Sequence, residues 1–112
     1  MATLDQRDAD GVNVVKISGS LNQHGVDTVE SAFAEATGAS RRMVVDLSGV
    51  DVLNTPAIAM FLGAHRMVQK GGGRLIFTGI QGPVDEVLRR CRLDTVLTIV
   101  PGMQEAIEWA KQ

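Results

Sequence analysis

The sequence predicts one α/β domain built on a mixed β-sheet. Short runs of β-branched and aliphatic residues alternate with segments whose apolar residues recur at helical spacing. Such alternation is typical of parallel strands joined by helical crossovers. Near the start, only a short turn separates two strand-like segments, so these two should pair antiparallel. We therefore expect one domain over residues 1–112, with a mostly parallel sheet, an N-terminal antiparallel hairpin strand and about four helices covering it.

The first half of the chain contains the hairpin, one helix and one central strand. Residues 3–7 and 12–18 have the composition of two paired strands. From Val26 onward, apolar residues follow a single helical stripe, and Gly38 is expected to end that helix. Residues 43–47 (MVVDL) form a short apolar run, which predicts a strand buried on both faces.

The second half continues the alternation of helices and strands. Its expected elements are a helix over 56–70, a strand over 74–78, a helix over 83–90, a strand over 96–100 and a last helix from Met103. Cys91 falls on the apolar side of the middle helix, where a buried, unreactive thiol is expected.

Composition excludes several classes of function. The net charge is −2 and aromatic residues are only 4%, with no Tyr, so neither a basic footprint nor a stacking platform for nucleic acid is expected. The single cysteine cannot form an internal disulfide or a multi-cysteine metal site, and it suits a reducing compartment. No apolar run has the length of a membrane span and the first residues do not resemble a signal peptide, so a cytoplasmic setting is expected.

No group of residues predicts catalysis, a cofactor or a metal. The glycines at 71–73 follow a helix and precede a strand, whereas a phosphate cradle needs the reverse order. His24 and His65 are the only histidines, and the pattern around His65 indicates a packed side chain. Because no acid, base and nucleophile can be assembled, we do not expect an enzyme.

The tripeptide Asn54-Thr55-Pro56 lies between an apolar segment and a helix. The side chain of Asn54 or Thr55 could cap the helix, and the fixed φ of Pro56 suits the first helical position. Capping alone would explain these three residues without any function.

The helix over 56–70 has two contrasting sides. At 100° per residue, one sector is entirely apolar and comprises Ala57, Met60, Phe61, Ala64 and Val68. The opposite side is small and then basic, with Ala59, Gly63, Arg66 and Lys70. This second side either faces water or forms a docking surface beside Thr55, and the pattern leaves both interpretations open.

Five segments in order resemble the anti-sigma-factor antagonists, the single-domain members of the STAS family. They are residues 14–22 (VVKISGSLN), 44–53 (VVDLSGVDVL), 72–79 (GGRLIFTG), 87–96 (VLRRCRLDTV) and 103–107 (MQEAI). The resemblance implies a regulator of transcription that acts through protein–protein contacts in signalling. In that family, the second Ser of an Asp-Ser-Ser-Gly motif is phosphorylated by the partner, an anti-sigma factor of the histidine-kinase-like ATPase type. The unphosphorylated form binds that partner.

The sequence departs from the family at this motif. Register places Asn54 at the family's Asp, Thr55 at the first Ser and Pro56 at the phosphorylated Ser, while Asn22 replaces the Asp of Gly-x-Leu-Asp. Proline has no hydroxyl, so position 56 cannot accept a phosphate. Thr55 is either an N-cap or a displaced phosphoacceptor.

The resemblance therefore implies a non-enzymatic interaction module that binds a kinase-type anti-sigma factor. The alternative is a STAS accessory subunit of a transport complex, or another signalling scaffold, that binds an ATPase or signalling subunit. In either case we expect no bound cofactor, no nucleic acid and no membrane insertion. The expected partner-binding residues are Asn22, Asn54, Thr55, Pro56, Ala59, Gly63 and Arg66.

Overall fold

The computed structural model describes residues 2–112. Its elements, in chain order, are β1 (Thr3–Ala9), β2 (Val12–Leu21), α1 (Gln23–Ala39), β3 (Arg42–Leu53), α2 (Thr55–Lys70), β4 (Arg74–Thr78), α3 (Gly82–Arg90), the 3₁₀ helix η1 (Leu93–Thr95), β5 (Thr98–Ile99) and α4 (Met103–Lys111). The predicted order of strands and helices is confirmed, and η1 is the one addition.

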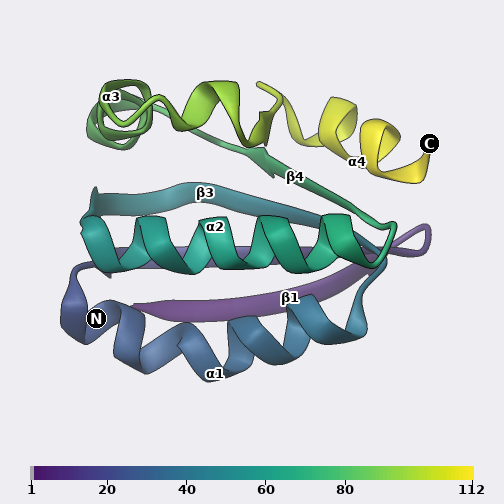
Figure 1. Ribbon diagram of the computed structural model, residues 1–112, viewed down its shortest axis with the longest axis horizontal. Coiled ribbons are helices and arrows are strands. Elements are labelled where there is room, and N and C mark those ends of the chain that lie inside the picture. Colours follow the sequence, from purple (N-terminus) through teal and green to yellow (C-terminus); the bar gives the residue numbers. More distant parts are fainter. Residues whose placement is uncertain (1) are drawn as a thin grey trace.

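The strands form a single mixed sheet in the order β1-β2-β3-β4-β5 (Figure 1). β1 pairs antiparallel with β2, and the other three pairings are parallel. The predicted fold class is therefore confirmed. Strands β2 and β3 are longer than the sequence pattern indicates and reach Leu21 and Leu53.

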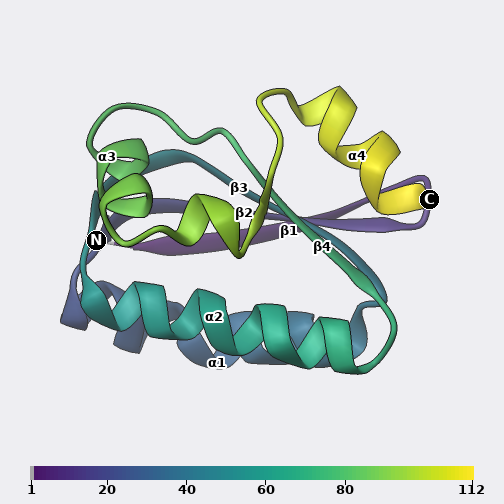
Figure 2. The ribbon, with the colours of Figure 1, turned by 45° about the horizontal axis from the view of Figure 1, so that its top comes forward.

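Helices cover both faces of the sheet. α1 and α2 lie side by side on one face and α4 lies on the opposite face (Figure 2). Alternate residues of each strand enter the two layers, so Val15 of β2 joins the core under α1 and α2 while Val14 joins the core under α4. α3 packs against β3.

Three phenylalanine rings form the centre of the larger core. Phe61 of α2 makes edge-to-face contacts with Phe33 of α1 and Phe77 of β4, at ring-centroid distances of 5.8 and 5.1 Å. All three rings are buried. They fix the position of α2 relative to α1 and the sheet, and hence the position of the surface that α2 presents.

Three local predictions are wrong. Gly38 does not end the first helix, because α1 continues to Ala39. The strand predicted over 96–100 shrinks to Thr98–Ile99, since η1 turns the chain so that Leu97 is buried while Val96 is 48% exposed. Cys91 is exposed rather than buried, because α3 ends at Arg90 and Cys91 is already part of the following turn.

Residues 2–112 contain neither a membrane-spanning helix nor a metal-binding group of side chains. None of their helices combines the length and apolar character needed to cross a bilayer. No three His, Cys, Asp or Glu residues in this part of the chain group together as a metal site would require.

Candidate partner-binding site

The predicted partner-binding residues begin at the carboxyl ends of two neighbouring strands. Leu21 of β2 and Leu53 of β3 are register partners in a parallel pairing. The residue that follows each strand leads into a helix. The backbone N–H of Asn54 donates to the carbonyl of Leu21 at 3.1 Å. The structure thus brings Asn22 and Asn54, which are 32 positions apart, to one corner of the sheet.

Asn22 is the N-cap of α1. Its backbone is extended, with φ −84°, and its side-chain oxygen accepts a hydrogen bond from the N–H of Gly25 at 2.9 Å. This bond satisfies one of the donors that the first turn of a helix leaves unpaired. An aspartate could accept the same bond, so asparagine at this position keeps the cap and removes a negative charge.

Asn54 occupies the N-cap position of α2 without capping it through its side chain. Its backbone carbonyl accepts from the N–H groups of Ala57 and Ile58 at 3.0 and 3.3 Å, but its amide makes no cap hydrogen bond. Thr55 is the first helical residue, so Pro56 occupies the second helical position, one place later than predicted. Side-chain capping therefore does not explain Asn54 or Thr55, and both side chains are exposed.

The two sides of α2 are oriented as predicted. Ala57, Phe61, Ala64 and Val68 are buried and Met60 is half-buried. Ala59, Gly63 and Arg66 are exposed. None of the ion pairs found in residues 2–112 involves Arg66. The corner thus continues into an accessible stripe of small residues that ends in an unpaired positive charge.

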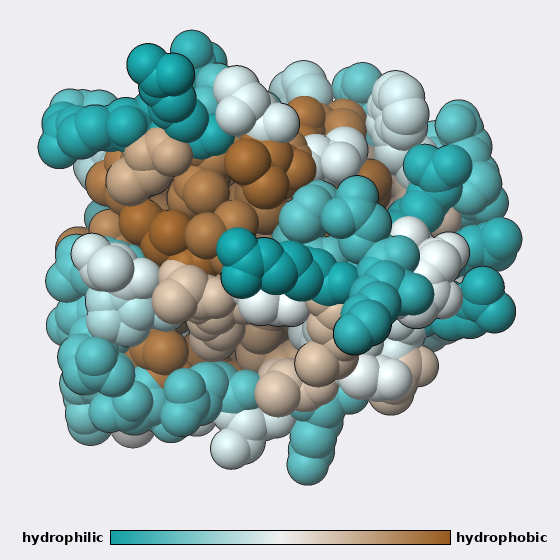
Figure 3. Space-filling model, in the orientation of Figure 1, coloured by the Kyte–Doolittle hydropathy of each residue, from teal (hydrophilic) through white to brown (hydrophobic). Residues whose placement is uncertain are grey.

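An apolar hollow flanks the corner on the side of α3. Figure 3 shows a broad apolar surface between α2 and the segment that carries α3. Within it, a hollow of about 440 Å³ is lined by Leu53, Asn54, Thr55, Pro56, Ile58, Val87, Arg90 and Cys91. Arg90 is paired with Glu86 at 2.7 Å, so its charge is already compensated. Apolar surface of this kind marks interaction sites on soluble domains.

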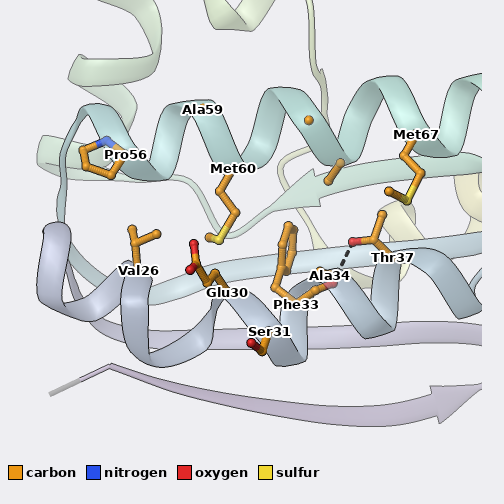
Figure 4. Close-up of a pocket in the computed structure, with 12 residues that line it drawn as sticks. Val26, Glu30, Ser31, Phe33, Ala34, Thr37, Pro56, Ala59, Met60 and Met67 are labelled. Carbon is orange, nitrogen blue, oxygen red and sulfur yellow. Dashed lines mark hydrogen bonds between the residues drawn. The ribbon is translucent and has the colours of Figure 1, made fainter.

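A second hollow lies between α1 and α2 (Figure 4). It has a volume of about 610 Å³, and its walls are formed by Val26 and Glu30 of α1 and by Pro56, Met60 and Met67 of α2, among others. Figure 4 shows the Glu30 carboxylate and the Met60 thioether facing one another across it. Pro56 borders both hollows, so its ring is the point at which the two apolar surfaces meet.

The contribution of α3 to this region could not be found from the sequence. Val87, Arg90 and Cys91 line the hollow beside Asn54, although more than 30 positions separate them from it. Their helical spacing indicates only that α3 has an apolar side. This side packs on the far end of β3 because β3 extends to Leu53. The local sequence pattern does not reveal that extension.

Comparison with known proteins identifies the family. The model of the STAS domain matches residues 3–106, which is nearly the whole chain. The chain belongs to the STAS domain family. The resemblance seen in the sequence is therefore confirmed.

Several proteins that resemble this STAS protein are anti-sigma factor antagonists. The anti-sigma F factor antagonist of Paenibacillus polymyxa is 24% identical over 99 residues, which cover 87% of this chain and 85% of the relative. A crystal structure of an anti-sigma factor antagonist from Mycobacterium paratuberculosis has a TM-score of 0.90 at 22% identity, covering 100% of this chain and 96% of the other. The Bacillus cell fate determinant SpoIIAA in its phosphorylated form has a TM-score of 0.70 at 17% identity, covering 95% and 97%.

The protein is thus an antagonist-like STAS protein, and this group is non-enzymatic. Its exposed corner is accordingly a candidate surface for binding another protein, rather than a place for turnover.

Proposed function

We propose that this STAS protein binds an anti-sigma factor of the histidine-kinase-like ATPase type through the corner formed by Asn22, Asn54, Thr55 and Pro56. The contact continues along Ala59, Gly63 and Arg66 of α2. In this proposal the protein is permanently in the form that binds the partner, because Pro56 stands where the antagonists carry their phosphorylated serine and has no hydroxyl.

The observation that carries the proposal is the accessibility of this corner. Asn54 and Thr55 are exposed, and the Asn54 amide makes no bond within its own helix, so it is available to a visiting backbone or side chain. Exposed small residues at Ala59 and Gly63 allow close approach of a partner backbone. An apolar hollow on each side of Pro56 adds surface that a partner would bury.

The four residues of the corner are themselves uncharged, whereas the family carries acidic residues at two of these positions. Asn22 and Asn54 replace two carboxylates, so the corner does not repel the phosphates of a nucleotide bound to the partner. Adding a phosphate at this point would place about two negative charges at the start of α2. Without a hydroxyl at position 56, phosphorylation at that position cannot regulate binding.

The test is a phosphorylation and binding assay with a kinase-type anti-sigma factor encoded in the same genome. The purified chain is incubated with that factor and ATP, intact mass is measured, and binding is measured by calorimetry. We expect firm binding and no gain of phosphate by the natural chain. The variant Pro56→Ser restores the hydroxyl, and we expect it to gain one phosphate and then to lose affinity for the partner.

Thr55→Val is the matched control, because it removes the neighbouring hydroxyl and keeps the shape of the side chain. It should gain no phosphate, and any change in its affinity for the partner measures the contribution of the Thr55 hydroxyl to the contact. A phosphate gained by the natural chain and lost in Thr55→Val would show that the acceptor has moved to Thr55 and would refute the permanently unphosphorylated form. Absence of binding to any such factor, together with recovery of a transporter ATPase from the host, would refute the proposal as a whole.

A further inference from the structure

Three arginines gather at the edge of the sheet opposite the partner-binding corner. Arg42 begins β3, Arg74 begins β4, and Arg41 precedes β3. Together with Gly11, Gly72, Gly73 and Gln112 they line a pocket of about 630 Å³. No apolar side chain lines this pocket, which distinguishes it from the hollows beside Pro56.

Two of these charges are held side by side by the sheet. Arg42 and Arg74 are register partners in the parallel pairing of β3 with β4, so their side chains leave the sheet on the same face. Like charges placed opposite one another on neighbouring strands destabilise the pairing. The third guanidinium belongs to Arg41, which lines the same pocket, and one of its terminal nitrogens lies within 3.8 Å of where a Cβ on Gly72 would be.

No side-chain carboxylate forms an ion pair with the cluster. The four ion pairs among residues 2–112 use Arg89, Arg90 and Lys111 as their cations, and none uses Arg41, Arg42 or Arg74. The hairpin turn that contributes Gly11 carries two carboxylates, but both are engaged locally. Asp10 binds Lys111 at 3.1 Å and raises its pKa, and Asp8 accepts from the N–H of Gly11 at 3.5 Å.

The glycine turn after α2 builds this arrangement. The N–H of Arg74 donates to the carbonyl of Arg41 at 2.7 Å, which joins the two segments directly. A Cβ on Gly73 would collide with that same carbonyl oxygen, so only glycine allows the close approach. The N–H groups of Gly71, Gly72 and Gly73 are all bonded to carbonyls of α2. Any anion here would therefore be held by guanidinium groups and not by a backbone cradle.

The hydrogen-bond donors of the pocket determine which class of ligand it can bind. Guanidinium groups bind phosphate oxygens with paired hydrogen bonds, and three of them match an anion with more than one charge. The Nε–H of Arg74 already donates to an oxygen of the carboxyl group of Gln112 at 2.6 Å, which fixes its side chain, compensates part of its charge and leaves the terminal nitrogens available. Because the pocket offers no apolar or aromatic wall, nothing in it would recognise a base or an acyl chain.

We propose that Arg41, Arg42 and Arg74 form a binding site for a compact soluble ligand with two or more phosphate charges, such as a diphosphate group. The site lies at the amino-terminal edge of the parallel strands, and the partner-binding corner lies at their carboxyl edge. This proposal is therefore independent of the proposed function, and each can fail without the other.

The test uses inorganic pyrophosphate as the probe on the full chain at low ionic strength. Binding is followed by calorimetry and by NMR shifts of backbone amides near the pocket. We expect saturable binding of one pyrophosphate, which weakens as salt is raised. Arg42→Gln and Arg74→Gln should each weaken it by roughly tenfold or more, the usual cost of losing a hydrogen bond to a charged group.

Arg92→Gln is the matched control, because Arg92 is exposed, forms no ion pair among residues 2–112 and follows α3, which borders the partner-binding corner at the opposite edge of the sheet. It should leave pyrophosphate binding unchanged. The Arg42→Gln variant should unfold at the same urea concentration as the natural chain or slightly higher, because it removes one of three neighbouring positive charges; a purely structural role would lower that midpoint.

Three outcomes would overturn the proposal. The first is the absence of saturable pyrophosphate binding. The second is an equal loss of binding in Arg92→Gln, which would indicate non-specific charge attraction. The third is binding only to phosphatidylcholine vesicles that contain phosphatidic acid, which would assign the arginines to a membrane surface instead of a soluble ligand.

Discussion

Replacing Phe61 by alanine tests the packing that positions the candidate site. Phe61 is completely buried and makes edge-to-face contacts with two other rings, one from α1 and one from β4. Truncation of a buried Phe costs about 3–5 kcal/mol. Each aromatic pair is worth about 0.5–1.5 kcal/mol beyond the area it buries, so the loss at Phe61 belongs at the upper end, at about 5 kcal/mol.

That loss is large relative to the whole stability of such a domain, which is about 5–15 kcal/mol. With a denaturant dependence of about 1.5 kcal/mol per molar urea, the unfolding midpoint of Phe61→Ala should fall by roughly 3 M. The assay is equilibrium unfolding in urea followed by circular dichroism. Phe61→Leu, which leaves a smaller void, is a milder variant if Phe61→Ala does not fold.

Met67→Ala is the surface control on the same helix, because Met67 is 53% exposed. It should change stability by less than about 0.5 kcal/mol. A loss below about 1 kcal/mol for Phe61→Ala would mean that its ring is not in the core. The orientation of α2, and with it the exposure of Ala59, Gly63 and Arg66, would then be wrong.

Two further predictions compare matched positions by urea unfolding. Asn22→Ala should lower the free energy of unfolding by about 1 kcal/mol, because it removes the cap bond to Gly25. Asn54→Ala should lower it by less than about 0.5 kcal/mol, because the Asn54 side chain makes no such bond. Equal losses would contradict this assignment of the caps. Gly38→Ala should stabilise the protein by about 0.5–1 kcal/mol, since a Cβ there meets nothing within 4 Å inside α1. Gly25→Ala should instead destabilise it by at least about 2 kcal/mol, because the Cβ would collide with the backbone oxygen of Ser20, and a neutral result would refute that close packing.

Much of the fold follows from local patterns in the sequence. The alternation of strand and helix signals predicts the mixed sheet. Short connections and right-handed crossovers leave few topologies that are compatible with this alternation. The apolar sector of the helix over 56–70 predicts which side of α2 is buried, and the structure confirms it. Local patterns are less successful at the ends of elements. Gly38 has the residue type of a helix end, but Ala36 and Thr37 beside it are buried, and this packing keeps the chain helical to Ala39.

The candidate site also has some features that the sequence predicts and others that it does not. The residues of the corner could be named from the sequence through the resemblance to the STAS family, because Asn22 matches its Gly-x-Leu-Asp motif and Asn54-Thr55-Pro56 matches its Asp-Ser-Ser-Gly motif. The role of each side chain could not be named. Asn22 makes its cap bond and Asn54 does not, although both are asparagines at the start of a helix, and the difference depends on where the backbone of each helix begins.

The sequence by itself determined the fold class, the buried side of α2 and the absence of a hydroxyl at Pro56, because each of these depends on residue type and on spacing along the chain. The tertiary structure alone decided what lies beside those residues. α3 borders the corner because β3 extends to Leu53, and the three arginines meet because the pairing of β3 with β4 aligns Arg42 with Arg74. Contacts of this kind depend on strand register and on how far each element extends, which are set by packing between segments distant in the sequence.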